Sequence, residues 1–262
     1  MQNENIIMAV KRRIEEIPIG EVFGYEVFGE LAQTRRKAIT RALSQLVKRE
    51  ELKRAYRAKF YRPDWCKYGA VPITDEARIK SLGNVYVTGH AAYNLLGIST
   101  QMPNLIDVAH PGKHYERKLR HLKIRYVRSS LLEIPEDADV ILLIMLDAIK
   151  NIKQISDASQ DDAVRRLLWI IKRIEKDRVE KMVEYAMHYP PRVRAVLGAM
   201  LERARYKRLR SLLKATLNPK TEYHIGLEDS LPNLRKWKLV GPARSYRAWK
   251  RRRDKRKERY GL

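Results

Sequence analysis

The chain has 262 residues, 44% of them hydrophobic, which is enough for one large domain or two ordinary ones with packed cores. Its single cysteine, Cys66, excludes an internal disulfide, and its longest apolar run, seven residues from Val140 to Leu146, is too short for a membrane helix of about 20. With no signal-type apolar block near the N-terminus, we expect a soluble cytoplasmic protein without a membrane partner.

The net charge of +24 is distributed unevenly. Residues 1–70 carry a net charge of +6, residues 71–147 are neutral, residues 148–234 carry +7 and residues 235–262 carry +11. Lys and Arg side chains that neutralise phosphates release counterions, so a chain this basic is expected to bind a polyanion at particular surfaces. A generally basic proteome is the alternative explanation.

The first 67 residues predict three helices followed by a hairpin. Apolar residues at helical spacing indicate a helix over 6–17, and a short helix over 25–32 follows a loop in which Phe23 is a buried anchor. A second amphipathic helix over 34–50 has Thr34 as its N-cap, and its inward face comprises Ile39, Ala42, Leu43 and Leu46. Residues 51–63 alternate like a two-stranded ribbon.

This order of elements, with basic residues on the last helix and on the ribbon, predicts a winged helix-turn-helix. Such a unit presents the polar start of its recognition helix to base edges, while surrounding Arg and Lys side chains bind phosphates. A solvated basic face is the alternative interpretation. The DNA-binding candidates on the helix and wing are Thr34, Arg35, Arg36, Lys37, Thr40, Arg41, Ser44, Lys53, Arg54, Arg57, Lys59 and Arg62.

Residues 74–129 predict a small sheet with two helices. A helix follows an N-cap at Thr74 or Asp75, and a strand over 85–88 precedes a helix over 89–98 that ends at a left-handed Gly97. The inward residues of that second helix are expected to be Ala92, Leu95 and Leu96. The segments 105–112 and 122–129 alternate like paired strands, with 113–121 as a charged connector.

From residue 135 the pattern is helical. Ser159, three residues before Asp162, predicts a capping-box start, and Pro191 stands at a favoured first-turn position. The expected helices cover 135–152, 159–174, 176–189, 191–204 and 207–217. The fold class is therefore α+β, with a winged helix-turn-helix at 1–67, a larger mixed domain with a small β-sheet and a C-terminal helical bundle at 74–234, and a basic tail at 235–262.

The tail combines 13 Lys and Arg with interleaved aromatic residues. Cations neutralise phosphate and rings stack on bases, so the tail suits nucleic acid, although a solvated or partner-binding tail is an equal alternative. Its candidate nucleic-acid contacts are Arg247, Trp249, Lys250, Arg251, Arg252 and Arg253.

No motif in the sequence indicates a catalytic site. His110 and His114 are four residues apart, but Pro111 and Gly112 between them exclude a helical metal site. Ser99 has no neighbouring His–Asp arrangement and no nucleophile elbow, and the acidic pairs lie at helix ends or turns. We expect no enzyme activity, no metal and no cofactor, while a dispersed active site of a nuclease or nucleotidyl-processing enzyme stays open.

Three segments resemble the AbiEi-type antitoxin family of type IV toxin–antitoxin and abortive-infection modules. These are "GEVFGYEVFGELA", "ALSQLVKREELKRAYRAKFYRP" and "YVTGHAAYNLLGISTQMP", and the resemblance covers roughly residues 5–215. The matching positions are Gly20, Val22, Phe23, Leu43, Leu46, Tyr61, Pro63, Ala92, Asn94, Leu96, Gly97, Gln101 and Pro103.

The resemblance implies an antitoxin that neutralises a nucleotidyltransferase toxin encoded alongside, without needing a stable complex, and that represses its own operon by binding promoter DNA. A stand-alone DNA- or RNA-binding regulator is the alternative. Wings of this family usually have glycines where this chain has Glu50–Glu51 and Ala58–Lys59. We therefore expect the wing turns to use another geometry.

Overall fold

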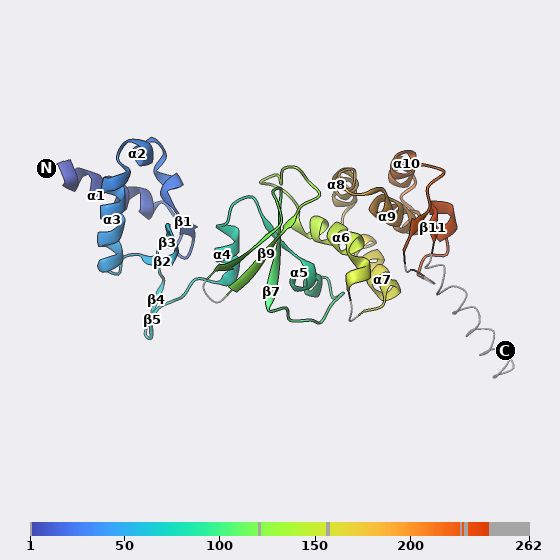
Figure 1. Ribbon diagram of the computed structural model, residues 1–262, viewed down its shortest axis with the longest axis horizontal. Coiled ribbons are helices and arrows are strands. Elements are labelled where there is room, and N and C mark those ends of the chain that lie inside the picture. Colours follow the sequence, from blue (N-terminus) through green and yellow to red (C-terminus); the bar gives the residue numbers. More distant parts are fainter. Residues whose placement is uncertain (1, 120–121, 156–157, 226, 228–229, 241–262) are drawn as a thin grey trace. The chain divides into compact units, whose positions relative to one another are not determined.

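The computed structural model describes residues 2–119, 122–155, 158–225, 227 and 230–240. It divides into two compact units (Figure 1). Unit 1 comprises the chain up to Tyr86 together with Arg117–Lys123. Unit 2 comprises Val87–Glu116 and the described residues from Ile124 onward.

Unit 1 begins with helices that pack around one apolar core. They are α1 (Gln2–Glu15), a 3-10 turn η1 (Tyr25–Phe28), α2 (Gly29–Thr34) and α3 (Arg36–Lys48). Phe23 is buried as the sequence predicts, and so are the four predicted inward residues of α3. Thr34 is not the N-cap of α3: it ends α2 and its hydroxyl donates to the Glu30 carbonyl, so Arg35 alone separates the two helices.

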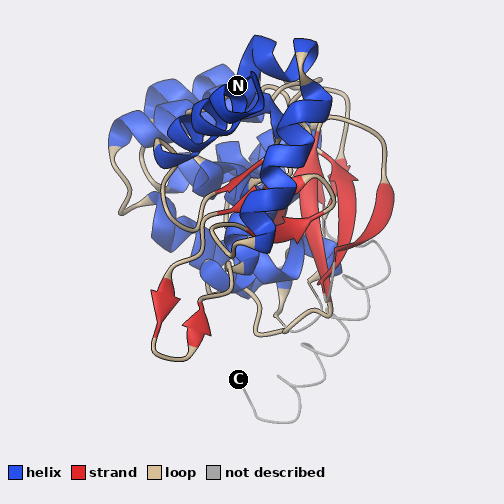
Figure 2. Ribbon diagram, turned by 90° about the vertical axis from the view of Figure 1, so that its left-hand side faces the viewer, coloured by secondary structure: helices blue, strands red, loops and turns tan. Residues whose placement is uncertain are grey.

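Unit 1 also contains a three-stranded antiparallel sheet. Its strands are β1 (Val22–Phe23), β2 (Lys53–Tyr56) and β3 (Lys59–Tyr61), in the order β1-β3-β2. Leu52 and Ala55 are buried beneath the predicted ribbon. The sequence did not predict the hairpin that follows, β4 (Trp65–Cys66) and β5 (Gly69–Ala70), which projects from this sheet (Figure 2).

Beyond the hairpin, Thr74 is the N-cap of α4 (Asp75–Lys80), since its hydroxyl accepts the Ala77 N–H. The four-stranded sheet that comes next has the order β6-β7-β9-β8. The strands are β6 (Tyr86–Thr88), β7 (Leu105–His110), β8 (Tyr115–Leu119) and β9 (Leu122–Arg128). The predicted pairing of the segments at 105–112 and 122–129 is confirmed, whereas the charged connector contains β8, an edge strand in which residues 115–118 are exposed. An exposed edge strand can carry charged residues throughout, so this segment lacks the alternating apolar pattern that predicts a strand.

Helix α5 (Gly89–Leu95) contacts β7 and α6. Gly97 has the predicted left-handed backbone, with a φ of 66°. Ala92 and Leu96 are buried as predicted, but Leu95 is 72% exposed. The buried residues of α5 are Gly89, Ala92 and Tyr93, and Leu95 lies off the face that they form.

Unit 2 continues with five helices, shown in yellow to orange in Figure 1. Ser159 accepts the Asp162 N–H at the start of α7, and Pro191 opens α9, both as predicted. The helices are α6 (Val140–Lys150), α7 (Gln160–Ile171), α8 (Lys176–Ala186), α9 (Pro191–Arg203) and α10 (Lys207–Ala215). Helix α6 starts at the Asp139 N-cap rather than at residue 135.

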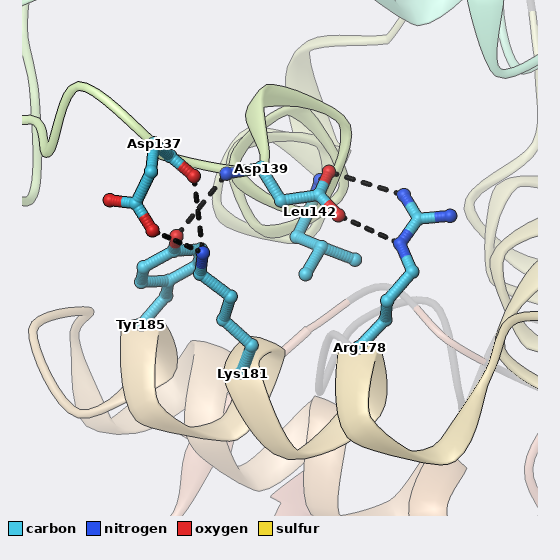
Figure 3. A network of polar contacts seen from close by, with 6 residues as sticks. All are labelled: Asp137, Asp139, Leu142, Arg178, Lys181 and Tyr185. Atoms are coloured by element: carbon cyan, nitrogen blue, oxygen red, sulfur yellow. Dashed lines mark hydrogen bonds and ion pairs between the residues drawn. The ribbon is translucent and has the colours of Figure 1, made fainter.

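Hydrogen bonds and ion pairs join the residues just before α6 to side chains of α8 (Figure 3). Arg178 donates to both carboxylate oxygens of Asp139, at 2.7 and 3.2 Å, while Oδ1 of Asp139 also accepts the Leu142 N–H. Lys181 donates to the carbonyl and the carboxylate of Asp137. The carboxylates of Asp137 and Asp139 therefore connect the start of α6 to α8.

Residues 235–240, which we assigned to the tail, are folded. They belong to η3 (Leu234–Trp237) and to β11 (Leu239–Val240), which pairs in parallel with β10 (Tyr223–His224). Trp237 is buried against Gly198, where any Cβ would collide with the indole ring. Glu202 accepts the Trp237 Nε1–H at 2.7 Å.

The described residues form a mixed α+β structure, as predicted. Among them, no helix has the length and apolar character needed to cross a membrane.

Candidate nucleic-acid interface

The exposed face of α3 carries the predicted recognition residues. At about 100° per residue, Arg36, Thr40, Ser44, Lys37 and Arg41 fall within an arc of about 140° opposite the buried residues. All are exposed except Ser44, which is half-buried. Arg35 and Thr34 are exposed at the junction that precedes the helix. One continuous polar, basic surface therefore runs along the helix.

Tyr25 positions the start of this surface, a role that sequence reasoning missed. Its hydroxyl lies 3.1 Å from Thr40 Oγ1, and the Arg36 guanidinium lies 5.0 Å above its ring. The ring also meets Phe60 of β3 edge-on, with centroids 6.5 Å apart. Arg36 and Thr40 are four residues apart, so their spacing indicates that a single side chain from another element can contact both. The spacing does not indicate that this side chain comes from η1.

The wing residues divide into two groups. Arg54 and Arg57 are exposed, Arg57 in the turn between β2 and β3 and Arg54 with its guanidinium 5.9 Å from the Phe60 ring. Lys53 pairs with Glu50 at 2.8 Å and Lys59 pairs with Glu26. Arg62 donates to the Ile17 carbonyl at 2.7 Å. The first group exposes guanidinium surface to solvent, where a phosphate could bind, whereas the second stabilises the wing.

Two non-glycine residues in the wing turns adopt the left-handed backbone conformation that glycine favours. Glu50 has a φ of 63° and Ala58 a φ of 61°. Our expectation of another geometry is therefore wrong. The left-handed region disfavours a Cβ by about 1–2 kcal/mol, and the surrounding hairpin offsets this cost.

An ion pair links η1 to the wing. Glu26 accepts hydrogen bonds from Lys59 Nζ and, at 2.9 Å, from the Gly24 N–H. Burial alone would raise the pKa of the Glu26 carboxyl, but these hydrogen bonds and the Lys59 charge outweigh it and leave the pKa below its ordinary value. Glu26 is therefore a carboxylate that neutralises one wing cation at neutral pH.

The predicted tail contacts Arg247, Trp249, Lys250, Arg251, Arg252 and Arg253 lie outside the described residues.

One histidine lies beside Ser99, although the sequence alone did not indicate the contact. His90 Nδ1 lies 3.2 Å from Ser99 Oγ. That oxygen also accepts the Gln101 N–H at 3.2 Å, and Ser99 is only 5% exposed. The fold brings the two residues together because the chain turns back at Gly97, and the pair ties the loop to α5.

The two histidines of the "HPGKH" stretch have distinct surroundings. His110 Nε2 lies 2.7 Å from the Lys113 carbonyl oxygen, and Nδ1 accepts the Gly112 N–H. The His110 ring meets Tyr115 and Tyr126 edge-on, and those two tyrosines stack with centroids 4.2 Å apart. His110 therefore closes a tight turn, while His114 is exposed.

Comparisons with known proteins leave the family open. No family model matches the chain, and no curated protein matches it. Among solved structures, the chain is similar to the RV2827C protein from Mycobacterium tuberculosis, with 14% identity, 89% of each chain covered and a TM-score of 0.43.

Proposed function

We propose that the protein is a DNA-binding antitoxin that represses its own operon and neutralises a nucleotidyltransferase toxin encoded alongside it. The observation that carries the DNA-binding part is the exposed arc of α3 beside the exposed wing arginines. An α-helix with this surface fits the major groove, and the flanking cations fit the neighbouring phosphates.

The contacts of Tyr25 at the start of α3 support the same proposal. Tyr25 holds Arg36 and Thr40 before any ligand binds, which lowers the entropy lost on binding. A merely solvated basic face has no need of such a contact. The antitoxin part of the proposal is supported by the sequence resemblance alone.

A binding titration tests the DNA-binding part. The full chain is titrated with a duplex spanning the promoter upstream of its gene and with a scrambled duplex of equal length, across a series of salt concentrations. We expect the promoter to be preferred by about 10³ or more. Equal affinity for both duplexes, or for single-stranded RNA of the same length, would reject a promoter-binding role.

Co-expression tests the antitoxin part separately. The nucleotidyltransferase gene that we expect beside this one is expressed from an inducible promoter with and without this protein. We expect this protein to restore growth. Promoter binding without restored growth would instead support a stand-alone regulator.

A further inference from the structure

The β4–β5 hairpin gathers large apolar side chains at the surface of unit 1. Trp65 is 52% exposed, Tyr68 is 84% exposed and Val71 is 40% exposed. A two-residue connection, Lys67–Tyr68, joins the strands, and Gly69 has a φ of 114°. Exposed aromatic residues grouped on a projecting element are uncommon on a surface that has no partner.

The hairpin is continuous with the wing. Lys53 Nζ of β2 lies 5.6 Å from the centre of the Trp65 ring, and Lys67 Nζ lies 4.9 Å from the centre of the Tyr68 ring. Each ring is thus accompanied by a cation. The same β2 strand carries the exposed Arg54, so basic surface leads from the wing to the hairpin.

Hydrogen bonds close the base of the hairpin without using either ring. The Asp64 carboxylate accepts the Trp65 N–H at 2.9 Å, and the Asp64 carbonyl accepts the Val71 N–H at 2.8 Å. The base of the hairpin is closed by backbone bonds, so the rings are not needed to hold it together. They remain available to a ligand.

We propose that this hairpin is a second DNA contact, in which Trp65 and Tyr68 pack on the sugar–phosphate edge of the duplex flanking the segment bound by α3. An exposed ring can pack on a sugar, and Lys67 beside the Tyr68 ring can pair with phosphate, which favours nucleic acid over an apolar protein surface. This inference rests on the proposed DNA-binding function and extends its footprint beyond helix and wing.

Hydroxyl-radical footprinting of the full chain on the promoter duplex tests the proposal. The variant is Trp65→Ala with Tyr68→Ala, and Lys67→Ala is a second, milder variant. Met8→Ala, which truncates another exposed apolar side chain of unit 1, is the matched control. Circular dichroism of each variant checks that it is folded before its binding is compared.

We expect the double variant to lose protection at one flank of the site while the central protection stays. Its affinity should fall about tenfold on the full duplex and stay unchanged on a duplex that lacks the flank. Lys67→Ala should show a smaller loss, and Met8→Ala none. Identical footprints and affinities for wild type and double variant would overturn the inference but leave the proposed function standing.

Two other outcomes would also overturn it. If the double variant binds DNA normally but fails to restore growth beside the toxin, the hairpin binds a protein. If the wild-type chain binds no duplex, the proposed function fails as well, and the wild-type titration identifies that case before any variant is compared.

Discussion

At the scale of single residues, the wing contains two side chains in a backbone conformation that suits glycine. Ala58 is exposed in the turn between β2 and β3, and its φ of 61° is left-handed. Ala58→Gly should therefore raise the free energy of unfolding by about 0.5–1 kcal/mol, because glycine enters this region without strain. Urea denaturation measures the change.

The control is Ala42→Gly in the buried face of α3, which should lower the free energy of unfolding by about 1 kcal/mol or more. Destabilisation by both glycines would mean that Ala58 is not strained. Glu50→Gly is a less clear test because Glu50 also pairs with Lys53.

Tyr25 gives a second prediction at this scale. Tyr25→Ala removes both the ring under Arg36 and the hydroxyl beside Thr40, so the preference for promoter over scrambled duplex should fall by about tenfold. Tyr25→Phe keeps the ring and should retain most of the preference. Parallel titrations measure both. If the phenylalanine variant loses as much as the alanine variant, the ring does not position Arg36.

At the scale of elements, one carboxylate connects α9 to the described residues 233–237. Glu202 accepts hydrogen bonds from Trp237, Asn233, Arg210 and Lys236 and is 15% exposed. Burial would raise the pKa of this carboxyl, but the bonds from Lys236, Trp237 and Asn233 outweigh it and lower the pKa from 4.5 to about 2. Glu202 thus ties α9 to η3.

The sign of the pH dependence follows from that lowered pKa. The Glu202 carboxylate makes its full contribution to the free energy of unfolding above pH 4.5, and this contribution disappears as the pH falls towards 2. Glu202→Gln should therefore reduce stability at neutral pH and weaken its dependence on pH between 4.5 and 2. Thermal unfolding at several pH values tests this, with the exposed Glu184→Gln as control. Equal pH dependence in wild type and Glu202→Gln would contradict the assignment.

Helix periodicity and caps predicted most elements, because they depend on neighbours three or four residues apart. The inward residues of α3, the Ser159 cap and the left-handed Gly97 are examples. The sequence missed β8, in which residues 115–118 are exposed, and the β4–β5 hairpin, whose strands have two residues each. Neither has a periodic apolar pattern to detect.

The candidate interface was predictable in part for the same reason. The exposed arc of α3 follows from local periodicity. Local periodicity does not reveal the contacts that distinguish Arg57 from Lys53, Lys59 and Arg62. Arg62 contacts Ile17, 45 residues earlier, and Lys59 contacts Glu26, 33 residues earlier. Such pairings depend on how the chain returns on itself.

At the scale of the whole molecule, the charge of +24 predicts an affinity for DNA that falls with salt. Arg57→Ala should weaken binding to promoter and scrambled duplex alike and lower the salt slope by about 1, because it removes a phosphate contact. Arg203→Ala removes the same charge from the exposed surface of α9 and should leave the slope unchanged. Equal slopes for wild type and Arg57→Ala would remove the wing from the interface.

The central claim is that α3 reads DNA, and the most direct measurement is the promoter affinity of Arg36→Ala and Arg41→Ala against Arg203→Ala. Fluorescence anisotropy at one fixed salt concentration, with promoter and scrambled duplexes, gives the free energies. A side chain that reads a base should cost about 1–3 kcal/mol on the promoter when removed, and less on the scrambled duplex. Promoter affinities of both α3 variants equal to that of Arg203→Ala would contradict the account.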